Sequence, residues 1–139
     1  MIFSKAWSYA VRSLLYLDLH RDEGSILSSQ VAKEEDIPNP FLAKVLSTLV
    51  AAGYVQSTRG RNGGFMLSRS LESISLYDIL MLFEHNSKID DCILRKGKCK
   101  DEDLCPVHRY WAEPQKQIAH FLVDTKLADL RSAFPKEQN

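Results

Sequence analysis

The sequence predicts a mainly α-helical fold with one small β-hairpin, and three features of the chain predict it. Apolar residues recur at intervals of three and four residues through most of the chain, as they do along the buried side of a helix. The exception is residues 54–68, where two short β-like pieces flank a glycine-rich turn. A length of 139 residues, with 45% hydrophobic and 26% charged residues, is that of one ordinary globular domain.

The first helix is expected over about the first twenty residues. Ala6, Tyr9 and Ala10 begin an apolar stripe that Leu14 and Leu17 continue at helical spacing. Polar residues interrupt this stretch, so it does not resemble a signal peptide. The longest apolar run in the chain, residues 79–83, is far short of a membrane span. We therefore expect a cytoplasmic protein without a membrane partner, whose thiols stay reduced.

Two short helices are expected next, over residues 28–35 and 39–52. Ser28 is a plausible cap of the first, and Asn39 can cap the second with Pro40 at its first helical position. Two short helices joined by a tight turn, the second with a polar outer face, are the outline of a helix-turn-helix.

A β-hairpin follows, with strands predicted at Tyr54–Thr58 and Phe65–Ser68. Arg59 and Arg61 lie at its tip beside Gly60, so the backbone there is free to approach a narrow groove. This is the wing of a winged helix-turn-helix, which we assign to residues 1–83.

The remainder divides into a polar loop over residues 84–105 and a helical segment over residues 106–139. A long helix is expected to end near Asp124, and Pro114 is expected to kink or restart it. Thr125 is a candidate cap for a last short helix, Lys126–Ala133. In so small a chain the long helix has little core to cover, so we expect it to be a dimerisation surface rather than a core lid.

Charge is segregated along a chain whose net charge is zero. Residues 37–70 contain Lys44, Arg59, Arg61 and Arg69 but no acidic residue. Such a segment presents a positive face to a phosphate backbone, although a plain solvated face has the same pattern.

The polar loop contains every cysteine in the chain. Cys92, Cys99 and Cys105 are followed by His108 in a C-x₆-C-x₅-C-x₂-H pattern. Thiolate and imidazole ligands suit zinc and iron–sulfur clusters, and the wide gaps favour the larger cluster over a tight zinc knuckle. Cysteines without a ligand are normally buried, so a coincidental grouping in a polar loop is a poor alternative. No motif of nucleophilic catalysis accompanies them, and we expect the protein not to be an enzyme.

These features together resemble a known family. The stretches "SKAWSYAVRSLLYL", "NPFLAKVLSTLVAAGYVQSTRGRNGGFML" and "SISLYDILMLFE", with the three-cysteine loop, resemble the Rrf2 superfamily of bacterial winged-helix regulators. The chain looks like the branch that contains IscR and NsrR. The sharpest motifs are the loop and S-x-R-G-x-x-G-G-F, formed by Ser57, Arg59, Gly60, Gly63, Gly64 and Phe65.

The resemblance implies a homodimer with crossing C-terminal helices, helix 39–52 in the major groove and Arg59 in the minor groove. It also implies a cluster held by the three cysteines, with His108 as the fourth ligand. Other branches draw a carboxylate ligand from the first helix, where this chain has Ser8. The recognition helix departs from the IscR-like Tyr-Leu-Glu-Gln by carrying Phe41-Leu42-Ala43-Lys44, so the target sequence cannot be carried over.

Our hypothesis from the sequence is a transcription regulator whose affinity for double-stranded DNA is controlled by an iron–sulfur cluster, with 2Fe–2S favoured over 4Fe–4S. Its signal is iron–sulfur status, redox state or nitric oxide. One alternative is a metal-independent or zinc-stabilised regulator that responds to thiol oxidation, and another is a small iron–sulfur carrier. The expected DNA-binding residues are Ser28, Asn39, Phe41, Lys44, Ser47, Thr48, Ser57, Arg59, Gly60 and Arg61.

Overall fold

The computed structural model describes residues 3–84, 91–94, 98 and 106–133. Its helices are α1 (Lys5–Leu19), α2 (Ser28–Glu34), α3 (Asn39–Ala51), α4 (Leu76–Phe83) and α5 (His108–Asp124). Its strands are β1 (Val55–Thr58) and β2 (Gly64–Leu67), and three short 3-10 helices are η1 (Arg21–Glu23), η2 (Leu71–Ser73) and η3 (Leu127–Ala133). The expected mainly α-helical class with one two-stranded hairpin is confirmed.

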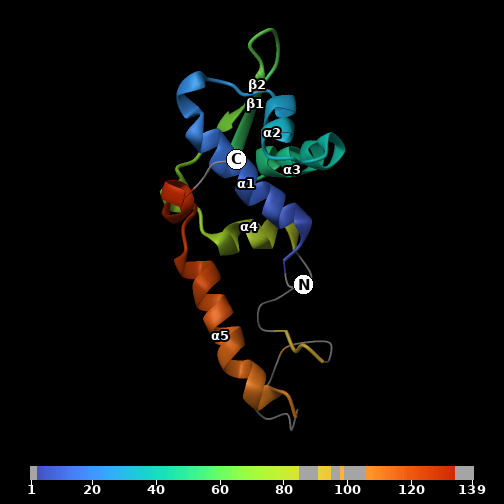
Figure 1. Ribbon diagram of the computed structural model, residues 1–139, viewed down its shortest axis with the longest axis vertical. Helices are drawn as coiled ribbons and strands as arrows, with labels where there is room; N and C mark the ends of the chain where they lie inside the picture. Colours follow the sequence, from blue (N-terminus) through green and yellow to red (C-terminus); the bar gives the residue numbers. More distant parts are fainter. Residues whose placement is uncertain (1–2, 85–90, 95–97, 99–105, 134–139) are drawn as a thin grey trace.

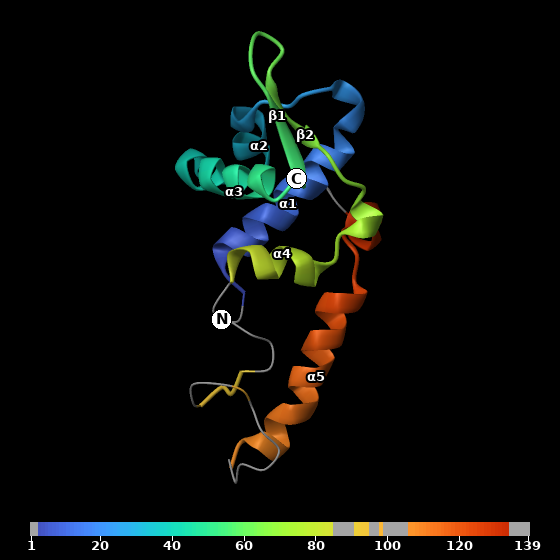
Figure 2. The same ribbon diagram turned by 180° about the vertical axis from the view of Figure 1, so that it is seen from behind.

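The molecule is elongated, with the hairpin and the first turn of α5 at opposite ends of its long axis (Figures 1 and 2). The helix α1 crosses the middle, where Ala10 and Leu14 are fully buried. Ser4 caps α1 by accepting a hydrogen bond from the backbone N–H of Trp7 at 3.2 Å. The indole N–H of Trp7 donates to the carbonyl of Leu76 at 3.1 Å, which fixes α4 against α1.

The helix-turn-helix is formed by α2 and α3, but both predicted caps were wrong by one residue. Leu27 and Pro38 have the extended backbone of a cap, while Ser28 and Asn39 are already helical and make no side-chain cap bond. The turn between the helices contains Asp36 in the left-handed conformation, with φ of 52°. It is closed by a hydrogen bond from the Ile37 N–H to the Ala32 carbonyl at 2.9 Å.

The two antiparallel strands pair Val55 with Leu67 and Thr58 with Gly64, so the hairpin is one residue shorter at each outer end than predicted. Gly64 is required by close packing as well as by its φ of 146°. A Cβ there would lie 2.4 Å from the carbonyl oxygen of Ile26, and Ile26 exchanges two main-chain hydrogen bonds with Phe65. The hairpin is thereby fixed to the segment that leads into α2.

The capping box predicted at the start of α4 is confirmed, since Ser75 and Asp78 exchange backbone-to-side-chain bonds of 3.0 and 2.9 Å. Of the two outcomes expected at Pro114, a kink or a restart, the restart does not occur, because α5 runs through Pro114 as one helix. Both Pro114 and Tyr110 are exposed, so the carbonyl that loses its donor faces water. The last short helix is present as η3, and at its start the Asp129 carboxylate accepts a hydrogen bond from the N–H of Lys126 at 2.8 Å.

Candidate functional site

The outer face of α3 presents most of the expected contact residues. Its inner side is buried through Leu42 and Leu46, which places Asn39, Lys44 and Ser47 on the exposed side. Thr48 differs from its neighbours, because it is half-buried and its hydroxyl donates to the Lys44 carbonyl at 3.1 Å. Four exposed groups on α3, those three and Phe41, are therefore available to a partner.

Phe41 stands out as an apolar group in this polar surface, with 58% of its area exposed. Its ring centroid lies 6.4 Å from that of Tyr9 on α1, and the guanidinium of Arg12 lies 5.8 Å from the Tyr9 ring. Sequence reasoning missed Tyr9 and Arg12 as surface neighbours of α3. Their spacing of three residues on one helix was the available signal, but it does not reveal which helix lies opposite.

Arg59, Gly60 and Arg61 are all exposed at the hairpin tip, the most distant point of the molecule from α5 (Figure 1). Gly60 has φ of 104°, and its carbonyl accepts from the N–H of Gly63 at 2.9 Å, which closes the turn. Arg69 is also exposed, but its guanidinium lies 4.7 Å from the ring of Tyr54 below the tip. The two arginines at the tip thus extend the basic surface beyond α3.

A cleft of about 300 Å³ opens on the surface where α2, α3 and the hairpin meet. Ser28, Ser47 and Ser57, three of the predicted contact residues, come from α2, α3 and β1 to line it. The rest of its lining is apolar and consists of Ala43, Leu46, Val50 and Phe65. The cleft thus combines three hydroxyl groups with an apolar floor, and cations flank it on α3 and on the hairpin. Such a surface can bind the sugar–phosphate backbone of a nucleic acid.

The described part of the cysteine loop lies against α5. Cys92 is half-buried, and the carbonyl of its neighbour Asp91 accepts a hydrogen bond from Gln115 of α5 at 3.2 Å. His108 is the first residue of α5 and is also half-buried. Cys99 and Cys105 lie outside the described residues, and no cluster of three potential metal ligands occurs within the described ones. Chemically, three thiols and an imidazole remain a donor set that fits an iron–sulfur cluster or zinc.

Ser8, for which the family resemblance implied the place of a carboxylate ligand in other branches, is half-buried on α1. None of the described helices combines the length and apolar character that crossing a bilayer needs.

Comparison with known proteins matches residues 3–133 to the model of the Rrf2 family, described as iron-dependent transcriptional regulators. A protein of Aquifex aeolicus described as an HTH-type transcriptional regulator is 39% identical over 132 residues, covering 94% of this chain and 91% of the relative. The HTH-type transcriptional regulator IscR of Serratia proteamaculans is 28% identical over 122 residues, covering 88% of this chain and 74% of its own length.

Two solved structures have the same fold. IscR of T. potens superposes with a TM-score of 0.73 at 26% identity, covering 99% of this chain and 90% of the other. CymR, the global cysteine regulator of B. subtilis, superposes with a TM-score of 0.77 at 23% identity, covering 94% and 95%.

Proposed function

The chain belongs to the Rrf2 family of transcriptional regulators, and from this premise we propose that it binds operator DNA as a homodimer whose affinity is set by an iron–sulfur cluster. It is a regulator and not an enzyme. The observation that carries the DNA-binding half is the cleft between α3 and the hairpin, with its three serines and its flanking cations.

The cleft matches the geometry of a duplex. A helix in the major groove and a hairpin in the adjacent minor groove are separated by one sugar–phosphate strand. That strand has to pass between α3 and β1, where Ser28, Ser47 and Ser57 can donate to phosphate oxygens. Arg59 and Arg61 then reach the minor groove, where the negative potential attracts arginine. Asn39, Phe41 and Lys44 face the base edges.

Three further residues of the proposed interface, Thr48, Gly60 and Phe41, have different roles. The Thr48 hydroxyl is bonded within α3, so we assign it to orienting the helix rather than to a direct contact. Gly60 has no side chain and allows the backbone to enter the narrow groove. Phe41 offers an apolar edge of the kind that contacts a thymine methyl group.

For the sensing half, Cys92, Cys99, Cys105 and His108 are the residues that would hold the cluster. Such a cluster supplies a centre that gains or loses electrons and is destroyed by oxidants, and a 2Fe–2S centre fits the three thiolates and one neutral imidazole. Two features of this chain support a link to the rest of the protein. The carbonyl of Asp91 is bonded to Gln115 of α5, and His108 begins that helix. A ligand that orders this loop can therefore act on the helix proposed as the dimer surface.

The test of this half is anaerobic purification of the whole chain. Visible absorption with iron and acid-labile sulfide near stoichiometry is the expected result, and Cys92→Ala should abolish both. Operator affinity should then differ at least ~5-fold between holo and apo protein, the lower range of ordinary allosteric coupling. Equal affinity of the two forms would show that the cluster does not control DNA binding.

A regulator of the same fold that responds to thiol oxidation is the alternative, since the same three cysteines could supply it. CymR is at 23% identity, so its likeness shows the fold alone and does not separate the two mechanisms. The same purification separates them. A colourless protein, free of iron, whose DNA affinity changes on reversible oxidation of its thiols would establish the alternative.

A further inference from the structure

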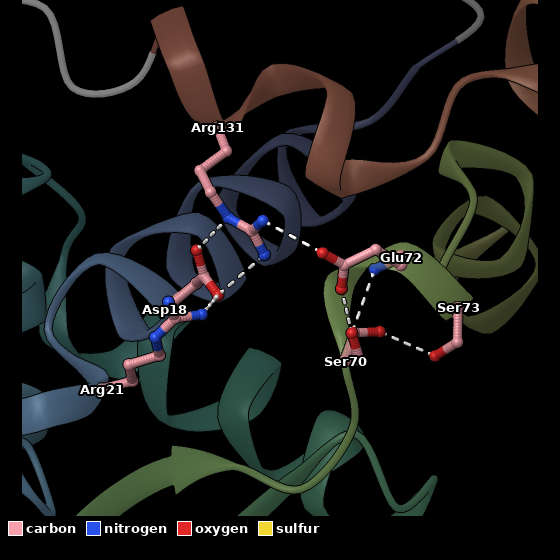
Figure 3. Close-up of polar contacts among 6 residues, drawn as sticks. All are labelled: Asp18, Arg21, Ser70, Glu72, Ser73 and Arg131. Carbon is pink, nitrogen blue, oxygen red and sulfur yellow. Dashed lines mark hydrogen bonds and ion pairs between the residues drawn. The ribbon is translucent and has the colours of Figure 1, made fainter.

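A charged network joins the end of α1 to η2 and η3 (Figure 3). The Nε of Arg131 donates to Asp18 Oδ2 at 2.7 Å, and its Nη2 donates to Asp18 Oδ1 at 3.2 Å. The third nitrogen, Nη1, donates to Glu72 at 3.1 Å. Arg131 belongs to η3, Asp18 to the last turn of α1, and Glu72 to η2. One guanidinium therefore ties the C-terminal segment to two parts of the winged helix.

The Asp18 carboxylate is the critical group in this network, because only 7% of its side-chain area is exposed. A buried carboxylate without a paired cation is costly, and a two-bond fork between guanidinium and carboxylate fixes orientation as well as distance. Arg21 also approaches Asp18, but at 3.4 Å from a side chain that is 62% exposed. Arg131 is thus the cation that sets the geometry around Asp18.

Glu72 is held ionised on the other side. Hydrogen bonds from Ser70 and from its own backbone N–H, followed by that from Arg131, lower the pKa of Glu72 from 4.5 to about 2. The hydrogen bonds to Asp18 and Glu72, followed by the negative charges of these carboxylates, raise the pKa of Arg131. Glu72 and Arg131 are therefore both charged at neutral pH.

The same place is where α5 is attached to the winged helix. We call residues 122–131 the junction. Leu122 and Leu127 are fully buried in the common core, and the N–H of Leu127 donates to the carbonyl of Ile74 at 2.8 Å. The carbonyl of Thr125 accepts from the N–H of Leu76 at 3.0 Å. By contrast, the first half of α5 points away from the winged helix (Figures 1 and 2).

This arrangement makes α5 a long arm fixed at one end. A small rotation at the junction becomes a large displacement at the far end of α5. The main-chain bonds of residues 125 and 127 resist translation, and the two-bond fork on Asp18 resists rotation of η3 about that segment. Because α1 also packs against α3, the fork joins the arm to the helix that carries the DNA-contacting surface.

We propose that Arg131 is a positioning residue, which, through its fork to Asp18, fixes the angle between α5 and α3 and so sets the spacing of the two DNA half-sites. This inference rests on the proposed homodimer that pairs through α5. In a two-fold dimer the separation of the recognition helices is fixed by the angle that each α5 makes with its own winged helix. Arg131 need not touch DNA for its loss to change which operators are bound.

The test measures the affinity of the full-length protein for a set of operators that differ in half-site spacing. A palindromic site is first selected by wild-type protein from a random duplex library, and its central spacer is then lengthened or shortened by one or two base pairs. Wild type is expected to lose ~10-fold or more per base pair, because each base pair also rotates one half-site around the duplex. Arg131→Gln and Asp18→Asn should flatten this dependence to within ~3-fold.

Arg21→Gln is the matched control, because it removes a cation near the same carboxylate but leaves the fork in place. It should keep the wild-type spacing dependence. Binding to a duplex with a single half-site should be unchanged in all three variants, since that contact does not depend on the arm. Circular dichroism and sedimentation verify that each variant is folded and dimeric.

Strict spacing dependence in a folded, dimeric Arg131→Gln protein would overturn the inference. If that variant does not fold, Arg131→Lys takes its place, since lysine keeps the charge but not the two-bond fork. It should give intermediate spacing dependence, and a wild-type dependence would count equally against the proposal. Failure of the proposed function itself looks different, because wild-type protein would then select no palindrome.

Discussion

The helices α3 and α5 both have one apolar side, but they bury it in different ways. Four residues of α3 lie in the core of its own chain: Leu42, Val45, Leu46 and Leu49. In α5, which the structure describes completely, only Leu122 near its end is buried. Tyr110 is 67% exposed, and Phe121, eleven residues further on and therefore on the same side of the helix, is about half-exposed. The position of α3 is therefore fixed by its own chain, whereas the exposed apolar side of α5 fits a second copy.

This difference separates what each mutation should disturb. Changes on the buried side of α3 should unfold the domain, changes on the apolar side of α5 should separate subunits, and changes at the hairpin should affect DNA binding alone. Each experiment below compares these regions, beginning with the largest expected effect.

The strongest effect is expected from Leu46→Ala, which removes a fully buried side chain at the centre of the helix-turn-helix. Lost burial and the cavity left behind should lower the free energy of unfolding by ~2–5 kcal/mol. Urea denaturation of the apo protein measures it. Val123→Ala is the control, because this half-exposed side chain lies two residues from Phe121 and so on another side of α5, and its loss should cost ~0.5 kcal/mol or less. Similar losses in both variants would mean that α5 is packed as tightly as α3.

Phe121→Glu should separate the subunits without unfolding them. A large aromatic group at the centre of a protein interface commonly contributes ~2 kcal/mol, so the dimer dissociation constant should rise ~30-fold or more. Sedimentation at several concentrations measures this constant, and far-ultraviolet circular dichroism should be unchanged. Leu27→Glu is the control. Leu27 is also exposed and apolar, but it lies close to the hairpin and not on α5, so dimerisation should be unchanged. An unchanged dissociation constant for Phe121→Glu contradicts α5 as the dimer surface.

At the hairpin, Arg59→Ala should weaken operator binding ~10-fold or more and lower the salt slope by about two units, because the homodimer loses one cation from each of its two hairpins. Ser47→Ala in the cleft should cost ~1 kcal/mol and leave the salt slope unchanged, since a neutral hydroxyl releases no counterion. Fluorescence anisotropy at several salt concentrations measures both. Dimerisation should be normal in each variant. An unchanged slope for Arg59→Ala removes the hairpin from the interface.

The smallest effect concerns pH. The folded pKa of Glu72, about 2, lies below its ordinary 4.5, so its ionised form stabilises the fold above pH 4.5, and this contribution is lost as the pH falls toward 2. Glu72→Gln should be slightly less stable than wild type at neutral pH, and the difference should vanish near pH 2. Because Glu72 is exposed, added salt should reduce the difference.

Glu35→Gln tests the opposite sign in the same experiment. Burial, which outweighs the bond from Arg12, raises the pKa of Glu35, so wild type loses stability as the pH rises through its folded pKa. The stability of Glu35→Gln relative to wild type should therefore increase with rising pH, whereas that of Glu72→Gln should decrease. If the stability difference between variant and wild type changes with pH in the same direction for both variants, one of these two pKa assignments is wrong.

Local patterns in the sequence were sufficient for the α-helices and the two strands, although not for the short helices η1 and η2. The apolar spacing of α1 and α3, the Ser75 to Asp78 capping box and the glycine-rich turn are interactions within a few residues of the chain. The errors lay at element ends. Ser28 and Asn39 were chosen as caps by residue type, but a cap also needs an extended backbone, and that conformation falls on Leu27 and Pro38.

The candidate site was only partly contained in the sequence. Residue types and motif spacing identified the exposed groups of α3, the arginines of the hairpin and the four proposed cluster ligands. They did not show that Ser28, Ser47 and Ser57 line one cleft, because no periodicity relates residues of different elements. The role of Cys99 and Cys105, outside the described residues, stays a prediction from the sequence.

By itself, then, the sequence determined the helices, the hairpin, the segregated charge and the thiol and imidazole groups of the proposed cluster site. Each of these follows from short-range geometry and side-chain chemistry. The tertiary structure decided which of these parts meet. Asp18 and Arg131 are 113 residues apart, and neither lies in a pattern that names the other. They pair because burial of Leu122 and Leu127 brings η3 against α1, and a carboxylate buried there needs a cation beside it.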